Sequence, residues 1–484
     1  MTRVARSLSL GLSLAALAGC TVGPNYHRPA APDSPAFKEA QGPVAAGWQV
    51  GQPGDGIDKG AWWSMYHDAV LDGLETQVAQ SNQTVKEYEA AYRQAHEVTA
   101  AARAAFFPTV GVTATGTRAH TAGALSTSGT GTGNTANSFQ GGLEASWVPD
   151  LWGKTRRTVE SDRDLAQASA ADLANARLAA QASLAQDYFQ LRVLDAQSGV
   201  YATMIASYRQ FVRITQVQFQ QGTQPQSALL TAQTQLLDAQ AAQQALGVQR
   251  AAMEHAIAVL VGKAPSQLSI AAADAALAPG GEVPVAPVSL PSTLLQRRPD
   301  IAAAERRMAS ENALVGVATA AYFPTVTLSG EVGTAASTLG GLFGAGAGLW
   351  SLGGSLAETL LDFGARHAQV QAARAAYDEQ VATYRQTVLT AFQGVEDQLA
   401  ALRIYAQEYE TLRQAEDNAH RTTQLDLIEY KAGTVDYTTV ITAQATELND
   451  RINRLTVLQE RLQASALLVE DLGGGWAATD LPKG

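Results

Sequence analysis

The sequence has a single cysteine, Cys20, in 484 residues. A lone cysteine excludes internal disulfides and any zinc site built from several cysteines. After the N-terminal stretch, no segment has 18 uninterrupted apolar residues, so no transmembrane helix is predicted. The formal net charge is −11, and no cluster of lysine and arginine indicates a nucleic-acid partner. If the chain spans a membrane, it must therefore do so with a closed β-barrel, in which every backbone group is paired.

Catalytic signals are also scarce. The seven histidines form no His-x-x-x-His pair of the kind found in zinc enzymes. We therefore expect no enzymatic activity, no metal site and no cofactor.

The N-terminus has the features of an export signal. Arg3 and Arg6 precede an apolar run from Leu8 to Leu17, which is shorter than the ~20 residues that span a bilayer. The run ends in Leu17-Ala18-Gly19-Cys20, which resembles the lipobox of bacterial lipoproteins. This resemblance implies that residues 1–19 are removed and that Cys20 carries an S-diacylglycerol group and an N-palmitoyl chain. Each buried CH₂ of such chains contributes ~0.8 kcal/mol to anchoring. The alternative is an ordinary cleavage site beside a chance cysteine.

An internal duplication organises the rest of the chain. Phe107-Pro108-Thr109-Val110 recurs as Phe323-Pro324-Thr325-Val326, a shift of 216 positions (107 to 323). Further along, Gly153 matches Gly364 and Gly222 matches Gly433, both with a shift of 211 positions (222 to 433). The same order of markers in both halves indicates two copies of one structural unit.

Each copy contains a long helical region. There is no proline between Pro149 and Pro225, and none in the second copy from Thr325 to Leu481. Alanine, glutamine, leucine and arginine predominate, and all four favour helix. Each copy is therefore predicted to contain a helical region of about 60 to 70 residues, roughly 90–105 Å long, which is interrupted once near its middle. Helices of this length must pack lengthwise against others.

Two alternating segments precede each helical region and are predicted to be strands, at about 107–118, 137–148, 323–333 and 348–360. Apolar side chains such as Val112 and Leu143 alternate with polar ones such as Glu144 and Glu331. Each segment has the length of a tilted membrane strand. A soluble sheet with one wet face would give the same alternation.

Four strands cannot close a barrel, since small barrels have about eight. Membrane insertion therefore requires strands from several copies, eight in a dimer or twelve in a trimer. Four long helix segments per chain would extend a trimer into a tube of twelve helices. Glu144 and Glu331 would then face the lumen.

The order of these elements resembles the TolC-like outer-membrane factors, specifically lipoproteins of the NodT type. The resemblance is carried by Val22-Gly23-Pro24-Asn25-Tyr26, by Leu294-Leu295-Gln296-Arg297-Arg298-Pro299-Asp300-Ile301 and by Leu472-Gly473-Gly474-Gly475-Trp476. It implies a mainly α-helical chain with a membrane β-barrel, assembled as a homotrimer with a 12-stranded barrel and a long α-helical barrel. It also implies an outer-membrane location, a periplasmic adaptor protein, and an inner-membrane transporter of the resistance-nodulation-division class. The channel would be a passive exit duct for small molecules such as drugs, toxic compounds or metal ions.

The expected organisation follows the two copies. Residues 1–19 form the signal peptide, 20–60 a lipid-anchored extension, 61–263 the first repeat, 264–299 an equatorial connection, 300–474 the second repeat and 475–484 a tail. Within the connection, Arg297 and Arg298 are expected to close a short helix, where cations complement the carbonyl end. Pro299 is expected to begin the next helix, with Asp300 near its positive end.

The glycines that interrupt the long helical regions predict two periplasmic tips. The resemblance implies that Gly222, Thr223, Gly433 and Thr434 lie at the tips that dock the adaptor. In the family, aspartates one to two turns after the second tip often form an acidic ring, but this chain has Thr439 and Thr442 there. We therefore consider Tyr430, Asp436, Thr439 and Thr442 as pore-constriction candidates. Alternatively, Tyr430 packs between helices and Asp436 caps one.

Two other functions fit parts of the pattern. A type I secretion channel for unfolded polypeptides would have the same architecture. A lipid-anchored coiled-coil scaffold that forms no channel would need no alternating strands.

The first prediction concerns the anchor. Because strand number and not acylation determines closure of a barrel, a Cys20→Ser variant exported behind a cleavable signal peptide should still form trimers and conduct ions in planar bilayers. A variant that stays soluble and monomeric would show that the lipid is also needed for assembly.

Overall fold

The computed structural model describes residues 21–32, 34, 36–39, 61–122, 134–273, 283–284 and 297–482. The predicted signal peptide, Cys20 and most of the 264–299 connection lie outside these ranges. The first repeat contains η2 (Trp62–Tyr66), α2 (Ala69–Ser81), α3 (Gln83–Ala104), β1 (Thr109–Thr121), β2 (Asn134–Trp147), α4 (Lys154–Gln220), α5 (Gln226–Leu260) and η4 (Pro265–Gln267). The second contains α7 (Pro299–Ala320), β3 (Thr325–Ala336), η6 (Gly340–Phe343), β4 (Gly348–Ala357), α8 (Ala365–Ala432), α9 (Tyr437–Asp471) and η7 (Ala478–Asp480).

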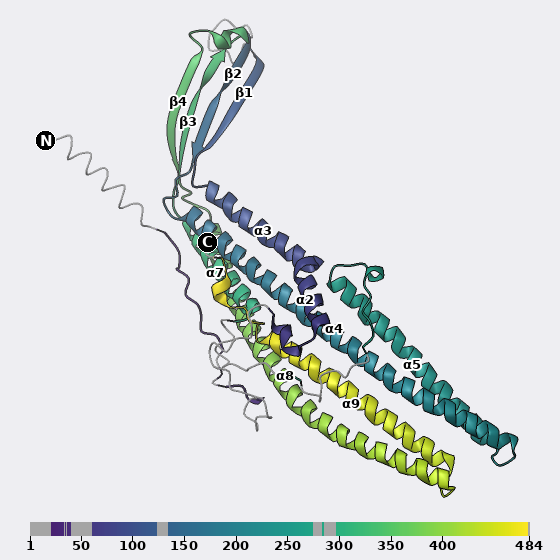
Figure 1. The fold of residues 1–484 in the computed structure, drawn as a ribbon. Helices are drawn as coiled ribbons and strands as arrows, with labels where there is room; N and C mark the ends of the chain where they lie inside the picture. Colours follow the sequence, from purple (N-terminus) through teal and green to yellow (C-terminus); the bar gives the residue numbers. More distant parts are fainter. Residues whose placement is uncertain are drawn as a thin grey trace.

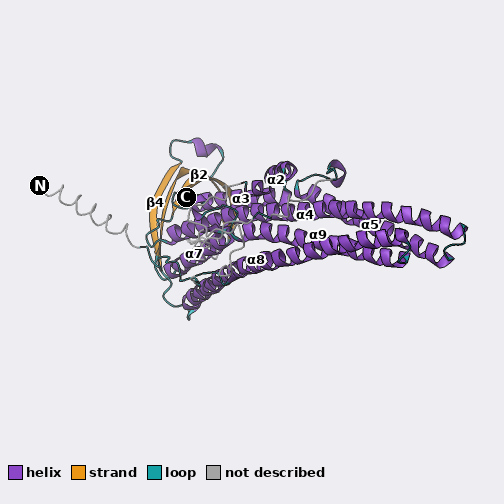
Figure 2. Ribbon diagram, turned by 60° about the horizontal axis from the view of Figure 1, so that its bottom comes forward, coloured by secondary structure: helices purple, strands orange, loops and turns teal. Residues whose placement is uncertain are grey.

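The molecule is elongated, with the β-sheet at one end and two helical tips at the other (Figure 1). Two helical hairpins, α4–α5 and α8–α9, run side by side and curve together (Figure 2). The shorter helices α3 and α7 lie between the sheet and the middle of the molecule. None of the described helices is both long and apolar enough to cross a membrane.

The four predicted strands form one antiparallel sheet in the order β1-β2-β3-β4. The two repeats meet at its centre, where β2 pairs with β3. The predicted bounds need correction, because β1 and β2 extend further toward their shared loop than expected. β4 ends at Ala357 rather than near 360. The chain turns there because the Asp362 carboxylate accepts hydrogen bonds from the Gly364 and Arg366 backbone N–H groups.

The long helices are confirmed, with 67 residues in α4 and 68 in α8. The interruption was predicted near the middle of each helical region, and this prediction is wrong. Helices α5 and α9 have only 35 residues each, so the break lies about two-thirds of the way along. In each repeat, a shorter helix lies nearer the sheet, α3 in the first and α7 in the second. It packs beside the part of the long helix that α5 or α9 does not reach.

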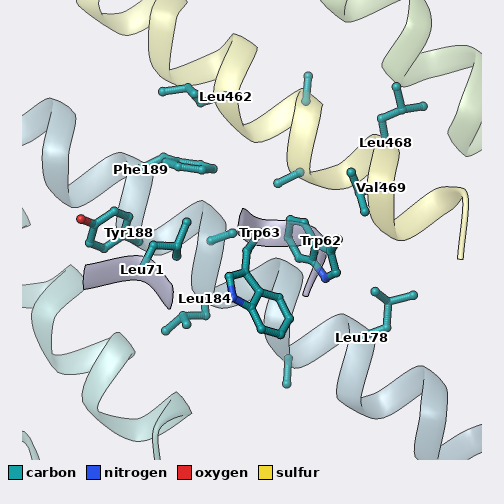
Figure 3. Packing of buried hydrophobic residues seen from close by; sticks show 14 of the residues in the cluster. Trp62, Trp63, Leu71, Leu178, Leu184, Tyr188, Phe189, Leu462, Leu468 and Val469 are labelled. Atoms are coloured by element: carbon teal, nitrogen blue, oxygen red, sulfur yellow. The ribbon is translucent and has the colours of Figure 1, made fainter. Parts of the chain in front are cut away.

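The largest buried cluster lies at the middle of the molecule, where η2 and α2 pack against α4 and α9 (Figure 3). Trp62 and Trp63 lie edge to face with ring centroids 6.0 Å apart. Leu184 and Leu468 are fully buried around them. Each such leucine contributes about 1.5–3 kcal/mol relative to an exposed one. This core holds η2 and α2 against both long hairpins.

That Arg297 and Arg298 close a short helix stays a prediction, because the residues directly before Arg297 lie outside the described ranges. The Arg298 guanidinium donates to the backbone oxygen of Asp471 at 2.8 Å and to the carboxylates of Asp471 and Asp300. It therefore complements the carbonyl end of α9. Pro299 does begin α7, with Asp300 in its first turn.

Glu75 on α2 is an unusual member of the core. Its side chain is fully buried, and neither carboxyl oxygen has a hydrogen-bond partner. Burial, with a smaller effect of Asp72, raises the pKa of Glu75 to about 9. The folded protein therefore holds a proton on Glu75 that the unfolded chain releases above its ordinary pKa of about 4.5.

This burial predicts a pH dependence of stability. The folded state binds more protons than the unfolded state between about pH 4.5 and 9, so stability should fall as the pH rises through that window. Glu75→Gln should remove this contribution, which is at most on the order of 4 kcal/mol at pH 7.5. Thermal unfolding of both proteins in detergent, followed by circular dichroism, measures the difference. Parallel pH profiles would contradict the buried, protonated carboxyl.

Candidate functional site

One face of the sheet is apolar and exposed. Val112, Leu143, Val332 and Trp350 form a row across all four strands, as direct partners in the three strand pairs. Val112 and Trp350 are 81% and 80% exposed. A neighbouring row continues the surface from Val110 to Leu352. An exposed apolar sheet face of this kind is typical of a surface that contacts lipid or another protein.

The opposite face is polar. Glu144 and Glu331, both predicted to face a lumen, are direct partners on β2 and β3. The Gln140 side chain donates a hydrogen bond of 2.6 Å to the Glu331 carboxylate. Threonine side chains of β1 and β3 occupy the same face, because alternate residues of a strand point the same way. The sheet therefore separates an apolar side from an acidic, hydrogen-bonding side.

The two tips have the same local structure. Gly222 and Gly433 have φ angles of 68° and 77°, a left-handed conformation that glycine adopts without strain. Thr223 donates to the Gln218 carbonyl through both its backbone N–H and its hydroxyl. Thr434 donates to the Glu429 carbonyl in the same way. Each tip thus ends its long helix with a glycine and a threonine that satisfy a free carbonyl group.

An aromatic cluster lies just behind the tips. The rings of Phe211 on α4, Tyr430 on α8 and Tyr437 on α9 lie 4.8 to 6.3 Å apart. The Tyr430 hydroxyl donates to the Gln218 side chain at 3.4 Å. These contacts join the two hairpins. Within the chain, Tyr430 therefore packs between helices, with part of its surface still exposed.

Asp436 directly precedes α9 and is exposed. Its backbone oxygen accepts from Thr439, but its side chain makes no capping hydrogen bond. Asp436 therefore occupies the N-cap position of α9, as the alternative interpretation proposed, but its carboxylate makes no capping hydrogen bond and faces solvent.

Thr439 and Thr442 line an open groove of about 530 Å³ between α8 and α9. The groove also contains Asp426, which the sequence analysis missed. Asp426 lies seven residues before Gly433 and Thr439 six residues after it, so the hairpin brings them to the same level. The acid that α9 lacks at this level is thus supplied by the facing helix α8. Counting outward from the tip glycine is the signal that would have found it.

Polar contacts tie α8 to α9 above this groove. The His420 ring nitrogen Nδ1 lies 2.7 Å from the Glu447 carboxylate, and the Gln424 amide contacts the other ring nitrogen. Further from the tip, the Glu416 carboxylate pairs with Arg451 and Arg454. The second hairpin is therefore held together by ion pairs as well as by apolar packing.

The segment that follows Cys20 is fixed to the base of the sheet. Cys20 itself lies outside the described residues. Val22 N–H donates to the Trp152 carbonyl at 3.1 Å, and Arg157 donates to the Asn25 side chain at 2.8 Å. The segment then runs along the helices, away from the sheet (Figure 1). Within the described ranges, no group of His, Cys, Asp and Glu comes together that could hold a metal ion.

Comparison with known proteins agrees with this arrangement. Residues 74–263 and 290–474 match the family described as outer membrane efflux protein. The solvent efflux pump outer membrane protein SrpC of Pseudomonas putida is 29% identical over 96% of this chain and 98% of its own. Outer membrane protein OprJ of Pseudomonas aeruginosa is 30% identical over 98% of this chain and 97% of its own. The solved outer-membrane channel OprN has a TM-score of 0.84 at 27% identity, covering 94% of this chain and 100% of that one.

The chain belongs to the outer membrane efflux protein family. It has the TolC-like channel fold, and it is an outer-membrane component of an efflux pump. The predicted family, the mainly helical TolC-like fold, the outer-membrane location and the efflux function are confirmed.

Proposed function

We propose that this chain is one subunit of a homotrimeric exit duct. The observation that carries the proposal is the sheet, which is apolar on one face and polar on the other, and whose outer strands β1 and β4 each have one free edge in the described part of the chain. In lipid, each unpaired backbone group costs several kcal/mol, so these edges must pair with other copies. Three chains supply twelve strands, and their hairpins continue the barrel as a helical tube.

The duct itself is passive, and its partners drive transport through it. A periplasmic adaptor protein docks on the tips that contain Gly222, Thr223, Gly433 and Thr434. An inner-membrane transporter of the resistance-nodulation-division class supplies the energy. The substrates are small molecules, such as organic solvents, drugs or metal ions.

The constriction lies near the second tip. Threefold symmetry brings three copies of each inward residue together. Tyr430, Asp436, Thr439 and Thr442 contribute to it, and Asp426 adds the carboxylate in the threonine-lined groove. A ring of carboxylates at this level attracts cations and repels anions.

The protein is anchored through acylated Cys20. The hydrogen bonds of Val22 and Asn25 to the first repeat support this proposal, because they hold the chain two residues after Cys20 at the base of the sheet. That is the level at which acyl chains would enter the inner leaflet of the outer membrane.

The test is conduction by the purified protein. Heat-resistant trimers should form and should give cation-selective channels in planar lipid bilayers. Asp426→Asn and Asp436→Ala should each lower the preference for cations, because each removes three charges from the constriction. Asp238→Asn, which removes an exposed carboxylate on α5 outside the groove, is the matched control.

Monomers without conductance would contradict the duct and would favour the scaffold. Channels whose selectivity is unchanged in both the Asp426 and the Asp436 variant would leave the duct intact and contradict the assignment of the constriction.

A further inference from the structure

The apolar face of the sheet ends in a polar patch, at the end of the sheet furthest from the helices (Figure 1). Alternate residues of a strand share a face, and on β1 those from Val110 to Gly116 on this face are small or apolar. The next two residues on the same face are Arg118 and His120. Their direct partners on β2 are Asn137 and Thr135. We call these four residues the rim patch.

Every side chain of the rim patch is exposed and can donate a hydrogen bond. The ring nitrogen Nδ1 of His120 lies 2.8 Å from the Thr135 hydroxyl, a contact that holds the ring beside β2. Among the described strand residues of this face, Arg118 is the only Lys, Arg, Asp or Glu. The glutamates of the strands, Glu144 and Glu331, lie on the opposite face. The rim patch is therefore a set of donors without a competing carboxylate, and this composition suits an oxyanion such as phosphate.

The position of the rim patch along the strands matches a membrane boundary. Trp147, partly exposed near the helices, marks the other boundary, because aromatic rings gather at both interfaces of a membrane barrel. β1 begins at Thr109, level with Ser146, and Arg118 lies nine positions further on (109 to 118). At about 3.3 Å per residue and a tilt of about 40°, this length spans roughly 23 Å, close to the ~25 Å apolar band of such barrels. In the duct proposed above, Arg118 thus lies at the level of lipid headgroups, where an arginine is tolerated best.

The short helix η6 adds an apolar surface on the same side. A Cβ atom on Gly341 would lie 3.0 Å from the Ala336 Cβ, and Ala336 pairs with Phe139 on the apolar face. η6 therefore folds back toward this face. Its Phe343 is 93% exposed, and Leu339, directly before it, is 64% exposed. A patch of donors with one cation, beside an exposed apolar turn, suits an amphiphile with an anionic headgroup.

We propose that the rim patch binds a phosphate group of lipopolysaccharide, the anionic glycolipid in the outer leaflet of the outer membrane. The proposal rests on the membrane position of the sheet in the proposed duct, and it adds a headgroup site on the outside of each subunit. The Arg118 guanidinium donates two parallel hydrogen bonds to the phosphate oxygens, and the His120 ring and the Asn137 amide donate further ones. Phe343 rests against the acyl chains of the same lipid.

A lipid is the occupant because the rim patch is continuous with the apolar face of the sheet. At an exposed site, water and salt weaken the attraction between a free phosphate ion and a single guanidinium. The phosphate of a lipid is instead held at headgroup level by its acyl chains, so its effective concentration at the rim patch is high. Apolar contact and phosphate contact then act together on one molecule.

Binding of lipid A, the acylated and phosphorylated part of lipopolysaccharide, to the purified full-length protein in detergent tests the site. Arg118→Gln should weaken binding of bisphosphorylated lipid A by about tenfold, the factor expected for a lost charge-assisted contact, and should leave binding of dephosphorylated lipid A unchanged. Titration followed by native mass spectrometry measures both affinities. Arg213→Gln removes an exposed guanidinium from α4 and is the matched control, which should bind both lipids as the wild-type protein does.

Two further variants separate the phosphate contact from the apolar contact. Asn137→Asp keeps Arg118 but places a carboxylate opposite it, so it should also weaken binding of the bisphosphorylated lipid alone. Phe343→Ser should weaken binding of both lipids equally, because it removes only apolar contact. Inorganic phosphate at the concentration of the lipid should not compete, and competition would overturn the lipid as the occupant.

The outcomes also separate this inference from the proposed function. The site is overturned if Arg118→Gln and Asn137→Asp bind bisphosphorylated lipid A as tightly as Arg213→Gln, or if they lose both lipids to the same extent. Ion conductance of the same preparations shows whether the duct stands in either case. A wild-type protein that neither forms trimers nor conducts ions overturns the duct, and the membrane position of the rim patch with it.

Discussion

Unpaired backbone groups at the two edges of the β-sheet are the constraint on which the rest of the architecture depends. β1 and β4 each have one partner strand within the chain, and the exposed apolar row that includes Val112 and Trp350 suits lipid rather than water. In lipid, an open edge is too costly to persist. The proposed ring of several copies would pair both edges, and the long helices that follow β2 and β4 would continue that ring.

Duplication gives the two repeats equivalent positions, and some of these positions have diverged in sequence. Within the chain, Trp152 donates a hydrogen bond to Pro324 and stacks on Phe323, whereas the equivalent residue Phe363 has no N–H to donate. The contact between the repeats also buries Ser161 and Ser310, whose mutual hydrogen bond satisfies both hydroxyl groups.

The sequence was sufficient to predict the features that depend on residues close together along the chain. Repeat markers, proline-free lengths and alternation predicted the long helices, the four strands and the glycine tips. Features that depend on which helix faces which were not predictable in this way. Arg298, for example, donates to the end of α9, 173 residues further along the chain. This is a tertiary contact, for which local periodicity carries no signal. Asp426 is different, because counting outward from Gly433 places it level with Thr439 across the hairpin.

The position of the N-terminal segment, which leads from the proposed anchor, also depends on tertiary contacts. Arg157 binds Asn25, the Tyr26 hydroxyl donates to Glu305 on α7 at 2.8 Å, and Arg28 donates to the Tyr384 hydroxyl on α8. Burial and the nearby Glu305 carboxylate raise the pKa of Tyr26, so its hydroxyl stays a donor at physiological pH. The segment thus bridges α4, α7 and α8, which come from both repeats. A lipid group at the proposed anchor would therefore be attached next to a segment that contacts helices of both repeats.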